Sequence, residues 1–256
     1  MDSEGLAFTD VGTGPPVVLL HGLTCHAGYW LRVAPLLEGL RVISLDFRGH
    51  GLSEHQPSYR YADYEADLVA LLDELELDRV PVAGHSLGGY VALSAAASGG
   101  RVGPVIAIDV KSDWTEADAA LAERSREAPQ RIESSREVVL DRLARSLGGM
   151  ELGPEELERL AERGIEEADG GWRLRWDRRV LDSEPVDPFA FLPRVGCAVH
   201  VMAGSESDVM PPEAARRFVA AIPNGSVEIV DGVGHHVELE APELVAACIR
   251  ELVARP

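Results

Sequence analysis

A buried strand that turns sharply into a helix is predicted by the run Val80-Pro81-Val82-Ala83-Gly84-His85-Ser86-Leu87-Gly88-Gly89-Tyr90. Small and apolar residues lead into the serine, and the alanine-rich segment 90–97 after it is typical of a helix. Side chains two positions before and after Ser86 would collide with the neighbouring strand and helix, so Gly84 and Gly88 give the clearance. The pattern places the Ser86 hydroxyl on a strained turn, with the N–H of Leu87 at the start of the helix. A glycine-rich turn with an incidental serine is the alternative.

Length and charge bound the class of protein. A chain of 256 residues can form one large domain, or a domain with an insertion, and bury a sizeable core. The net charge of −19 argues against nucleic acid or an anionic membrane as a partner. Lys111 is the only lysine, and the other basic residues are arginines.

The cysteines and the start of the chain indicate a cytoplasmic protein. Cys25, Cys197 and Cys248 are odd in number and far apart, which favours free thiols over a disulfide framework or a zinc site. Residues 1–5 lack the basic and apolar regions of a signal peptide. No apolar run approaches the length of a membrane span, so no membrane partner is expected.

Apolar strands alternate with amphipathic helices along most of the chain. This order predicts an α/β fold with a doubly wound, mostly parallel sheet, whose ligands bind at the carboxyl ends of the strands. Strands are expected at 6–11, 17–20, 41–46, 80–83, 102–110, 198–203 and 226–230. Helices are expected at 27–37, 64–75, 90–97, 212–222 and 242–253.

A helical cap is predicted as an insertion after the strand that follows the Ser86 turn. Residues 111–188 are rich in charge and carry helical stripes over 132–147 and 154–164. We therefore expect the first part of the core at 1–110, the cap at 111–188 and the second part of the core at 189–256. The inward face of the cap, with Trp114 as a candidate substrate contact, should cover the strand ends.

Residues with chemical potential follow several predicted strands. After the strand at 17–20, Gly22 lets a substrate approach the backbone, the N–H of Leu23 is a candidate oxyanion donor, and Thr24 is a further candidate substrate contact. In the loop after the strand at 41–46, Asp46 and Arg48 are expected to brace the turn rather than do chemistry. The candidate catalytic groups occur in the order Ser86, Asp208, His235, each just after a predicted strand.

In these features the chain resembles the α/β-hydrolase fold family over essentially its full length. The resemblance implies Ser86 as nucleophile, His235 as general base, Asp208 as the acid that orients it, and the N–H groups of Leu23 and Leu87 as the oxyanion hole. No metal or organic cofactor is implied. The motifs that carry the resemblance are His21-Gly22, Asp46-Phe47-Arg48-Gly49-His50-Gly51-Leu52-Ser53, Gly84 to Gly89, Gly204 to Asp208, and Gly234-His235 followed by Glu240 and Pro242.

The acid departs from the family pattern. Many relatives carry it three residues after the strand-end glycine, where this chain has Ser207, and Asp208 follows. Other relatives take the acid from the strand after the serine turn, which would be Asp109 or Asp113. Glu206 is a further alternative. We expect Asp208 to fill the role.

Two more choices concern the histidines and the nucleophile. His235 is preferred to the adjacent His236 because it directly follows Gly234, as in the family motif. The run from His235 to Glu238 could suggest a metal site, but no second ligand cluster supports one in the sequence. Serine at the turn argues against dehalogenase-like and epoxide-hydrolase-like relatives, which attack with aspartate.

The sequence thus predicts a serine hydrolase that cleaves a carboxylic ester or a related small acyl substrate through an acyl-enzyme on Ser86. Lactone or thioester hydrolysis, carbon–carbon bond hydrolysis and cofactor-free perhydrolysis would use the same residues. A protein that only binds a small ligand on the same fold is the alternative from another class. The identity of the substrate and the oligomeric state stay open.

Overall fold

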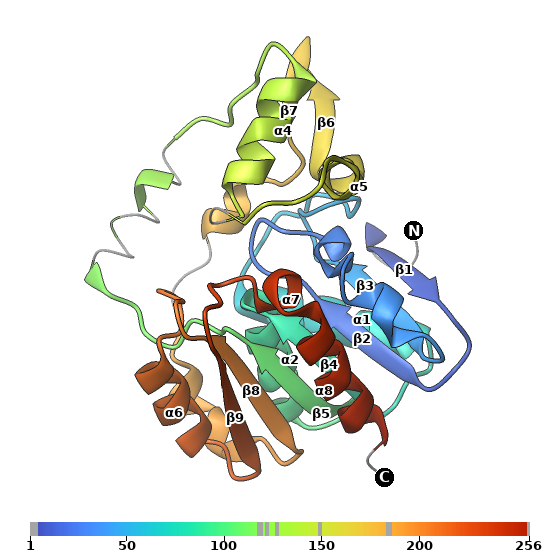
Figure 1. Cartoon of the computed structure of the whole chain (residues 1–256), viewed down its shortest axis with the longest axis vertical. Coiled ribbons are helices and arrows are strands. Elements are labelled where there is room, and N and C mark those ends of the chain that lie inside the picture. The colour runs from blue at the N-terminus through green and yellow to red at the C-terminus, as the bar shows by residue number, and fades with distance from the viewer. Residues whose placement is uncertain are drawn as a thin grey trace.

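One seven-stranded sheet organises the molecule, and all of its strands are parallel except the first (Figure 1). The structure is a computed structural model that describes residues 5–116, 120, 123–125, 128–147, 150–182 and 186–254. The strand order is β1-β3-β2-β4-β5-β8-β9, and β1 lies antiparallel to β3 at one edge. The predicted fold class is therefore confirmed. The strands are β1 (Ala7–Val11), β2 (Pro16–Leu20), β3 (Arg41–Asp46), β4 (Val80–His85), β5 (Val102–Ile108), β8 (Val199–Gly204) and β9 (Gly225–Val230).

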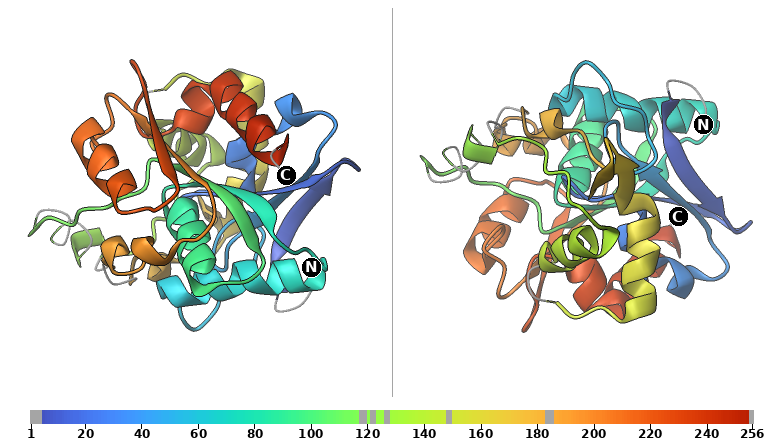
Figure 2. Two further views of the ribbon diagram at one scale, coloured as in Figure 1. Left: turned by 90° about the horizontal axis from the view of Figure 1, so that it is seen from below. Right: turned by 90° about the horizontal axis from the view of Figure 1, so that it is seen from above.

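Helices cover both faces of the sheet, as expected for parallel strands with continuous apolar sequences (Figure 2). One face packs against α1 (Tyr61–Glu74), α2 (Leu87–Ser98) and α6 (Pro212–Ala220). The other packs against α8 (Pro242–Ala254) and the short 3-10 helices η2 (Ala27–Trp30) and η3 (Ala34–Leu37). The short helix α7 (Val237–Glu240) follows the last strand.

The helix expected at 27–37 is two 3-10 turns instead. Leu31 N donates to Gly28 O and Val33 N donates to Trp30 O, so the hydrogen bonds skip three residues rather than four. Pro35 has no N–H to donate to Leu31 and cannot continue an α-helix from the preceding turn. The segment still buries Trp30 and Leu37 against the sheet, as its apolar pattern predicts.

A cap region lies between β5 and β8, at the top of Figure 1. It contains α4 (Arg136–Arg145), α5 (Pro154–Gly164) and a hairpin of β6 (Ile165–Ala168) and β7 (Gly171–Leu174), so it is not purely helical. The 3-10 helices η4 (Arg178–Asp182), η5 (Pro188–Ala190) and η6 (Leu192–Arg194) lead back to β8. The domain boundaries at 111 and 188 remain a prediction.

The cap has its own small core, which also rests on the main domain. Val139, Leu143 and Leu147 of the expected stripe are buried there, whereas Val138 is 41% exposed and Ile132 44% exposed. Ile132 precedes α4, which begins at Arg136, and Val138 lies on the exposed side of that helix, so the predicted stripe began too early. Cys25, Tyr29 and Leu239 of the main domain complete this core.

Buried and half-buried ion pairs fix the cap and the loop after β3 to the main domain. Asp46 is fully buried, accepts hydrogen bonds from Ala27 N (2.6 Å) and Leu52 N (2.9 Å), and pairs with Arg163 of α5. Arg48 donates to Asp67 of α1 at 2.8 Å. The bracing role predicted for Asp46 and Arg48 is therefore confirmed.

Among the described residues, no helix combines the length and the apolarity that crossing a membrane requires.

Candidate active site

Ser86 occupies the strained turn between β4 and α2 that the sequence predicts. Its φ of 50° and ψ of −113° lie in a region that side chains rarely adopt. The turn is held by a hydrogen bond from Ser86 N to Ile108 O on β5 (2.7 Å). A Cβ atom on Gly84 would lie 2.3 Å from the Gly88 backbone, and one on Gly88 would lie 2.4 Å from Leu20 O. The glycines therefore give the clearance that the turn needs.

Ser86 opens into a cavity of about 150 Å³ at the carboxyl ends of the strands. Four other predicted site residues line the same cavity: Leu23, Leu87, Trp114 and His235. Gly22 lies directly behind the serine, since a Cβ atom there would be 3.3 Å from Ser86 Cβ. The described residues that line the cavity do not include Thr24 or Asp208.

The acid beside His235 is Asp109, so the expectation that Asp208 pairs with this histidine is wrong. His235 Nδ1 donates to Asp109 Oδ2 at 2.6 Å, and the Asp109 side chain is fully buried. Asp208 lies in the loop beyond β8, exposed to solvent. The loop reaches the same region through Ser207, whose hydroxyl donates to Asp109 Oδ2 at 2.6 Å, while Gly204 N donates to Oδ1 at 3.2 Å.

The backbone at Asp109 explains how this carboxylate reaches the histidine. Asp109 has a φ of 49°, an uncommon value for a residue other than glycine, at the end of β5. The turn of the backbone brings the side chain over the strand ends, and the hydrogen bond from Asp109 N to Met202 O (2.8 Å) fixes it. The sequence signal that favours Asp109 is the serine at 207, which occupies the family's acid position with a group that donates a hydrogen bond.

His21 has a structural role in the loop that follows β2 and is not a catalytic group. Its Nδ1 donates to Gly22 O at 2.7 Å, and its Nε2 accepts a hydrogen bond from Phe47 N at 3.0 Å. This tautomer is the neutral one, and burial lowers the pKa of His21 to about 4. The ring thus joins the loop after β2 to the loop after β3.

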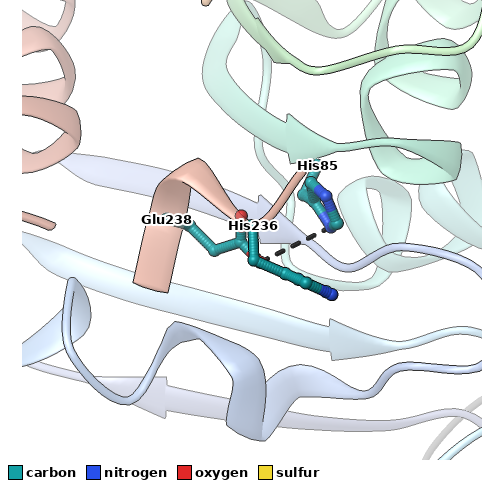
Figure 3. Close-up of side chains that lie close together, drawn as sticks. All are labelled: His85, His236 and Glu238. Atoms are coloured by element: carbon teal, nitrogen blue, oxygen red, sulfur yellow. Dashed lines mark hydrogen bonds and ion pairs between the residues drawn. The ribbon is translucent and has the colours of Figure 1, made fainter. Parts of the chain in front are cut away.

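The sequence analysis noted His236 and Glu238 but missed that His85 lies beside them, and Figure 3 shows these three buried side chains. His85 Nε2 donates to the carbonyl oxygen of His235 at 3.1 Å and therefore helps to place that residue. His236 Nδ1 lies 3.0 Å from Glu238 Oε1, and the same oxygen lies 3.5 Å from His85 Nδ1. Burial lowers the pKa of His85 far below its ordinary value. Burial opposes the charged form of His236 too, but the Glu238 carboxylate outweighs it and raises the pKa of His236.

Two sets of three residues in the described part of the chain have donor atoms close enough to hold a metal ion. One is His85, His236 and Glu238, and the other is His200, Glu228 and Cys248 at the strand edge beside α8. In the first set, His236 Nδ1 and Glu238 Oε1 are already hydrogen-bonded to each other at 3.0 Å. In the second, His200 Nδ1 is hydrogen-bonded to Ser226 Oγ at 2.9 Å and its Nε2 to Glu228 at 3.3 Å. Hydrogen bonds thus account for the donor atoms of His200 in the second set, whereas His85 Nδ1 and Glu238 Oε2 of the first set are buried without a hydrogen-bond partner among the described residues.

Known proteins resemble this chain over most of its length. The family model described as "Alpha/beta hydrolase family" matches residues 17–248. Esterase YbfF of Escherichia coli (strain K12) is 27% identical over 92% of this chain and 91% of its own length. The 2-(acetamidomethylene)succinate hydrolase of Mesorhizobium japonicum is 28% identical over 97% of this chain and 91% of its own length. A thermophilic esterase from Thermogutta terrifontis, solved with malate bound, is 27% identical, covers 96% of this chain and 92% of its own, and superposes with a TM-score of 0.74.

Proposed function

Because the chain belongs to the alpha/beta hydrolase family, we propose that it is a serine hydrolase that cleaves a carboxylic ester or a related small acyl substrate. One observation carries the proposal. His235 holds the buried carboxylate of Asp109 through Nδ1 at 2.6 Å, and it lines the same cavity as Ser86, which sits on a strained turn. A serine, a histidine and a buried acid in this relation form a nucleophile, its base and the group that orients the base.

In the proposed reaction, His235 acts through the nitrogen that Asp109 leaves free. The hydrogen bond to Asp109 keeps the proton on Nδ1, so Nε2 carries a lone pair and takes the proton of Ser86 Oγ as that oxygen attacks the substrate carbonyl. Asp109 stabilises the imidazolium that results. The C–O bond to the leaving alcohol then breaks, and the alcohol takes the proton from Nε2.

Water completes the cycle by the same groups. His235 removes a proton from a water molecule, the hydroxide adds to the acyl carbon, and Ser86 Oγ leaves with the proton returned by His235. The backbone N–H groups of Leu23 and Leu87, which both line the cavity, are the proposed oxyanion donors in each half-reaction. The acid product then diffuses away. Gly22 has no side chain, which leaves room for His85 and Ser86 beside this backbone.

Labelling of Ser86 tests the proposal directly. A fluorophosphonate probe should modify the wild-type protein at Ser86, and Ser86→Ala should abolish both the labelling and the hydrolysis of p-nitrophenyl acetate and butyrate. The expected loss of kcat is on the order of 10³-fold or more. A wild-type protein that neither reacts with the probe nor cleaves any ester would instead be a small-ligand-binding protein on this fold.

A further inference from the structure

The three buried side chains of Figure 3 come from residues next to Ser86 and His235 in the chain. His85 directly precedes Ser86, His236 directly follows His235, and Glu238 lies two residues further on, in α7. The side chains of His85 and Glu238 are 2% and 1% exposed, and that of His236 is 9% exposed. A ligand held by all three would therefore join the strand that carries the proposed nucleophile to the segment that carries the proposed base.

The hydrogen bond of His85 leaves a lone pair beside the Glu238 carboxylate. His85 Nε2 lies 3.1 Å from the carbonyl oxygen of His235, and a carbonyl oxygen only accepts, so the proton of the neutral ring is on Nε2. Nδ1 then carries a lone pair, and it lies 3.5 Å from Glu238 Oε1, which is also an acceptor. Two acceptors that face each other away from water repel one another unless a cation or a proton lies between them.

Two of the polar atoms in this group lack a hydrogen-bond partner among the described residues. They are His85 Nδ1 and Glu238 Oε2, and both are fully buried. Most buried polar atoms in folded proteins are hydrogen-bonded, so an unpaired one calls for a specific cause such as an ion. A cation between the imidazole and the carboxylate would satisfy both atoms.

The distances within the group suit a zinc ion. Zn²⁺ binds histidine nitrogen and carboxylate oxygen at about 2.0–2.2 Å in tetrahedral geometry, which places its ligand atoms roughly 3.3–3.5 Å apart. Glu238 Oε1 lies 3.0 Å from His236 Nδ1 and 3.5 Å from His85 Nδ1, and the three donor atoms all lie within 4.8 Å of one another. Only small movements of the side chains would bring all three donor atoms to zinc-binding distances.

The surroundings of His85 also match those of a metal ligand. A histidine that binds a metal through one nitrogen commonly donates its other N–H to a carbonyl or a carboxylate, which fixes the orientation of the ring. His85 has this arrangement, with Nε2 donating to the His235 carbonyl and Nδ1 directed to the group. The second histidine ligand that the sequence around His236 lacked is thus supplied by β4.

We propose that His85, His236 and Glu238 form a structural site for a divalent transition-metal ion, with Zn²⁺ as the ion that two imidazoles and a carboxylate suit best. The ion would bind His85 Nδ1, His236 Nδ1 and the Glu238 carboxylate. The proton that His236 Nδ1 donates to Glu238 in the metal-free protein would pass to the solvent on binding. The ion would not contact the substrate, and its role would be to hold the segments that carry Ser86 and His235 together.

Metal binding to the untagged, full-length protein tests the site without any measurement of hydrolysis. The protein is stripped with EDTA and titrated with ZnCl₂ by calorimetry, and thermal unfolding is recorded with and without Zn²⁺. We expect one Zn²⁺ per chain in the tightest class of sites. At free Zn²⁺ about 100-fold above Kd, Tm should rise by about 5–10 °C, as expected for a ligand that binds only the folded state of a chain of this size.

Three variants assign the binding to these side chains. Glu238→Gln keeps the size of the side chain and removes its charge, and His236→Phe keeps a planar ring and removes Nδ1. Each should weaken Zn²⁺ binding at least about 100-fold and abolish the rise in Tm, while unfolding in EDTA shows whether the variant is folded. His200→Ala is the matched control, because it removes a histidine from the second set of possible ligands, and it should bind Zn²⁺ as the wild type does.

The inference is overturned if the wild-type protein binds no Zn²⁺, if Glu238→Gln binds it as tightly as the wild type, or if His200→Ala abolishes the binding. Should neither ligand variant fold, crystals of the wild-type protein grown with ZnCl₂ decide the question. An anomalous difference peak about 2.0–2.2 Å from the three donor atoms is expected, and its absence there would refute the site. These results do not depend on the reactivity of Ser86, so they stand apart from the test of the serine hydrolase function.

Discussion

Replacement of Asp109 by asparagine should lower kcat by about 10⁴-fold, which corresponds to about 5 kcal/mol of transition-state stabilisation. The carboxylate accepts from Gly204 N through Oδ1 and from Ser207 Oγ and His235 Nδ1 through Oδ2. An asparagine has only one acceptor oxygen. The fixed backbone N–H of Gly204 needs that oxygen on its side, so the amide NH₂ would face His235.

The NH₂ group then imposes the wrong tautomer on the base. His235 would accept at Nδ1 and carry its proton on Nε2, where it could no longer take the proton of Ser86. The Ser207 hydroxyl can rotate its hydrogen away, so we expect the fold to survive the change. Asp208→Asn is the matched control, and its exposed side chain predicts a kcat within about threefold of the wild-type value.

The assay is the steady-state hydrolysis of p-nitrophenyl butyrate by the three proteins, with thermal unfolding measured to confirm that each is folded. The rate of fluorophosphonate labelling at Ser86 should fall in parallel for Asp109→Asn. A loss above 10³-fold in Asp208→Asn, beside a loss below tenfold in Asp109→Asn, would refute the assignment of the acid.

Four further changes test other parts of the structure. His235→Ala should lower kcat at least 10³-fold in the same ester assay, whereas His236→Ala should cost much less activity. Because His236→Ala leaves the buried Glu238 carboxylate without its partner, it should reduce the free energy of unfolding in urea by on the order of 3 kcal/mol. Gly88→Ala puts a Cβ atom 2.4 Å from Leu20 O, so it should destabilise the Ser86 turn. The variant should have a lowered Tm or should fail to accumulate as soluble protein. A normal Tm would contradict the described turn. Stability should also fall as the pH drops below about 6.5, because buried histidines with low folded-state pKa values must take up protons on unfolding. Each such histidine contributes a slope of about 1.4 kcal/mol per pH unit, and the raised pKa of His236 partly opposes the effect. A urea midpoint that stays constant from pH 6.5 to 4 would contradict this expectation. These histidines are His21 (pKa about 4), His26 (about 3) and His50 (about 3).

The parts of the structure that follow from local sequence were predictable. The apolar strands and the clearance around Ser86 depend on neighbours a few residues away, and both are as expected. The strand at 41–46 and the helix at 154–164 agree with the structure to the residue.

The acid depended on information that local sequence does not contain. Both Asp109 and Asp208 follow strands whose carboxyl ends meet at the same edge of the sheet, so position along the chain does not separate them. Two features decide which aspartate contacts His235: the unusual φ of Asp109, and the different side-chain directions of Ser207 and Asp208 in the loop after β8. The position of His85 beside His236 and Glu238 was not predicted for the same reason, since His85 comes from β4 and the other two from the segment around α7.

The distance between Ser86 and Asp109 is set by the backbone pairing of two adjacent strands rather than by loops. β4 and β5 are adjacent, Gly84 pairs with Ala107 and His85 with Ile108, and Ser86 and Asp109 are the next residues on each strand. The hydrogen bond from Ser86 N to Ile108 O is the last one between the two strands before the side chains of Ser86 and Asp109. The loop after β8 therefore contributes only the Ser207 hydroxyl to this group. We therefore expect that its exposed residues, Glu206 and Asp208 among them, can be replaced without changing the relative positions of Ser86 and Asp109.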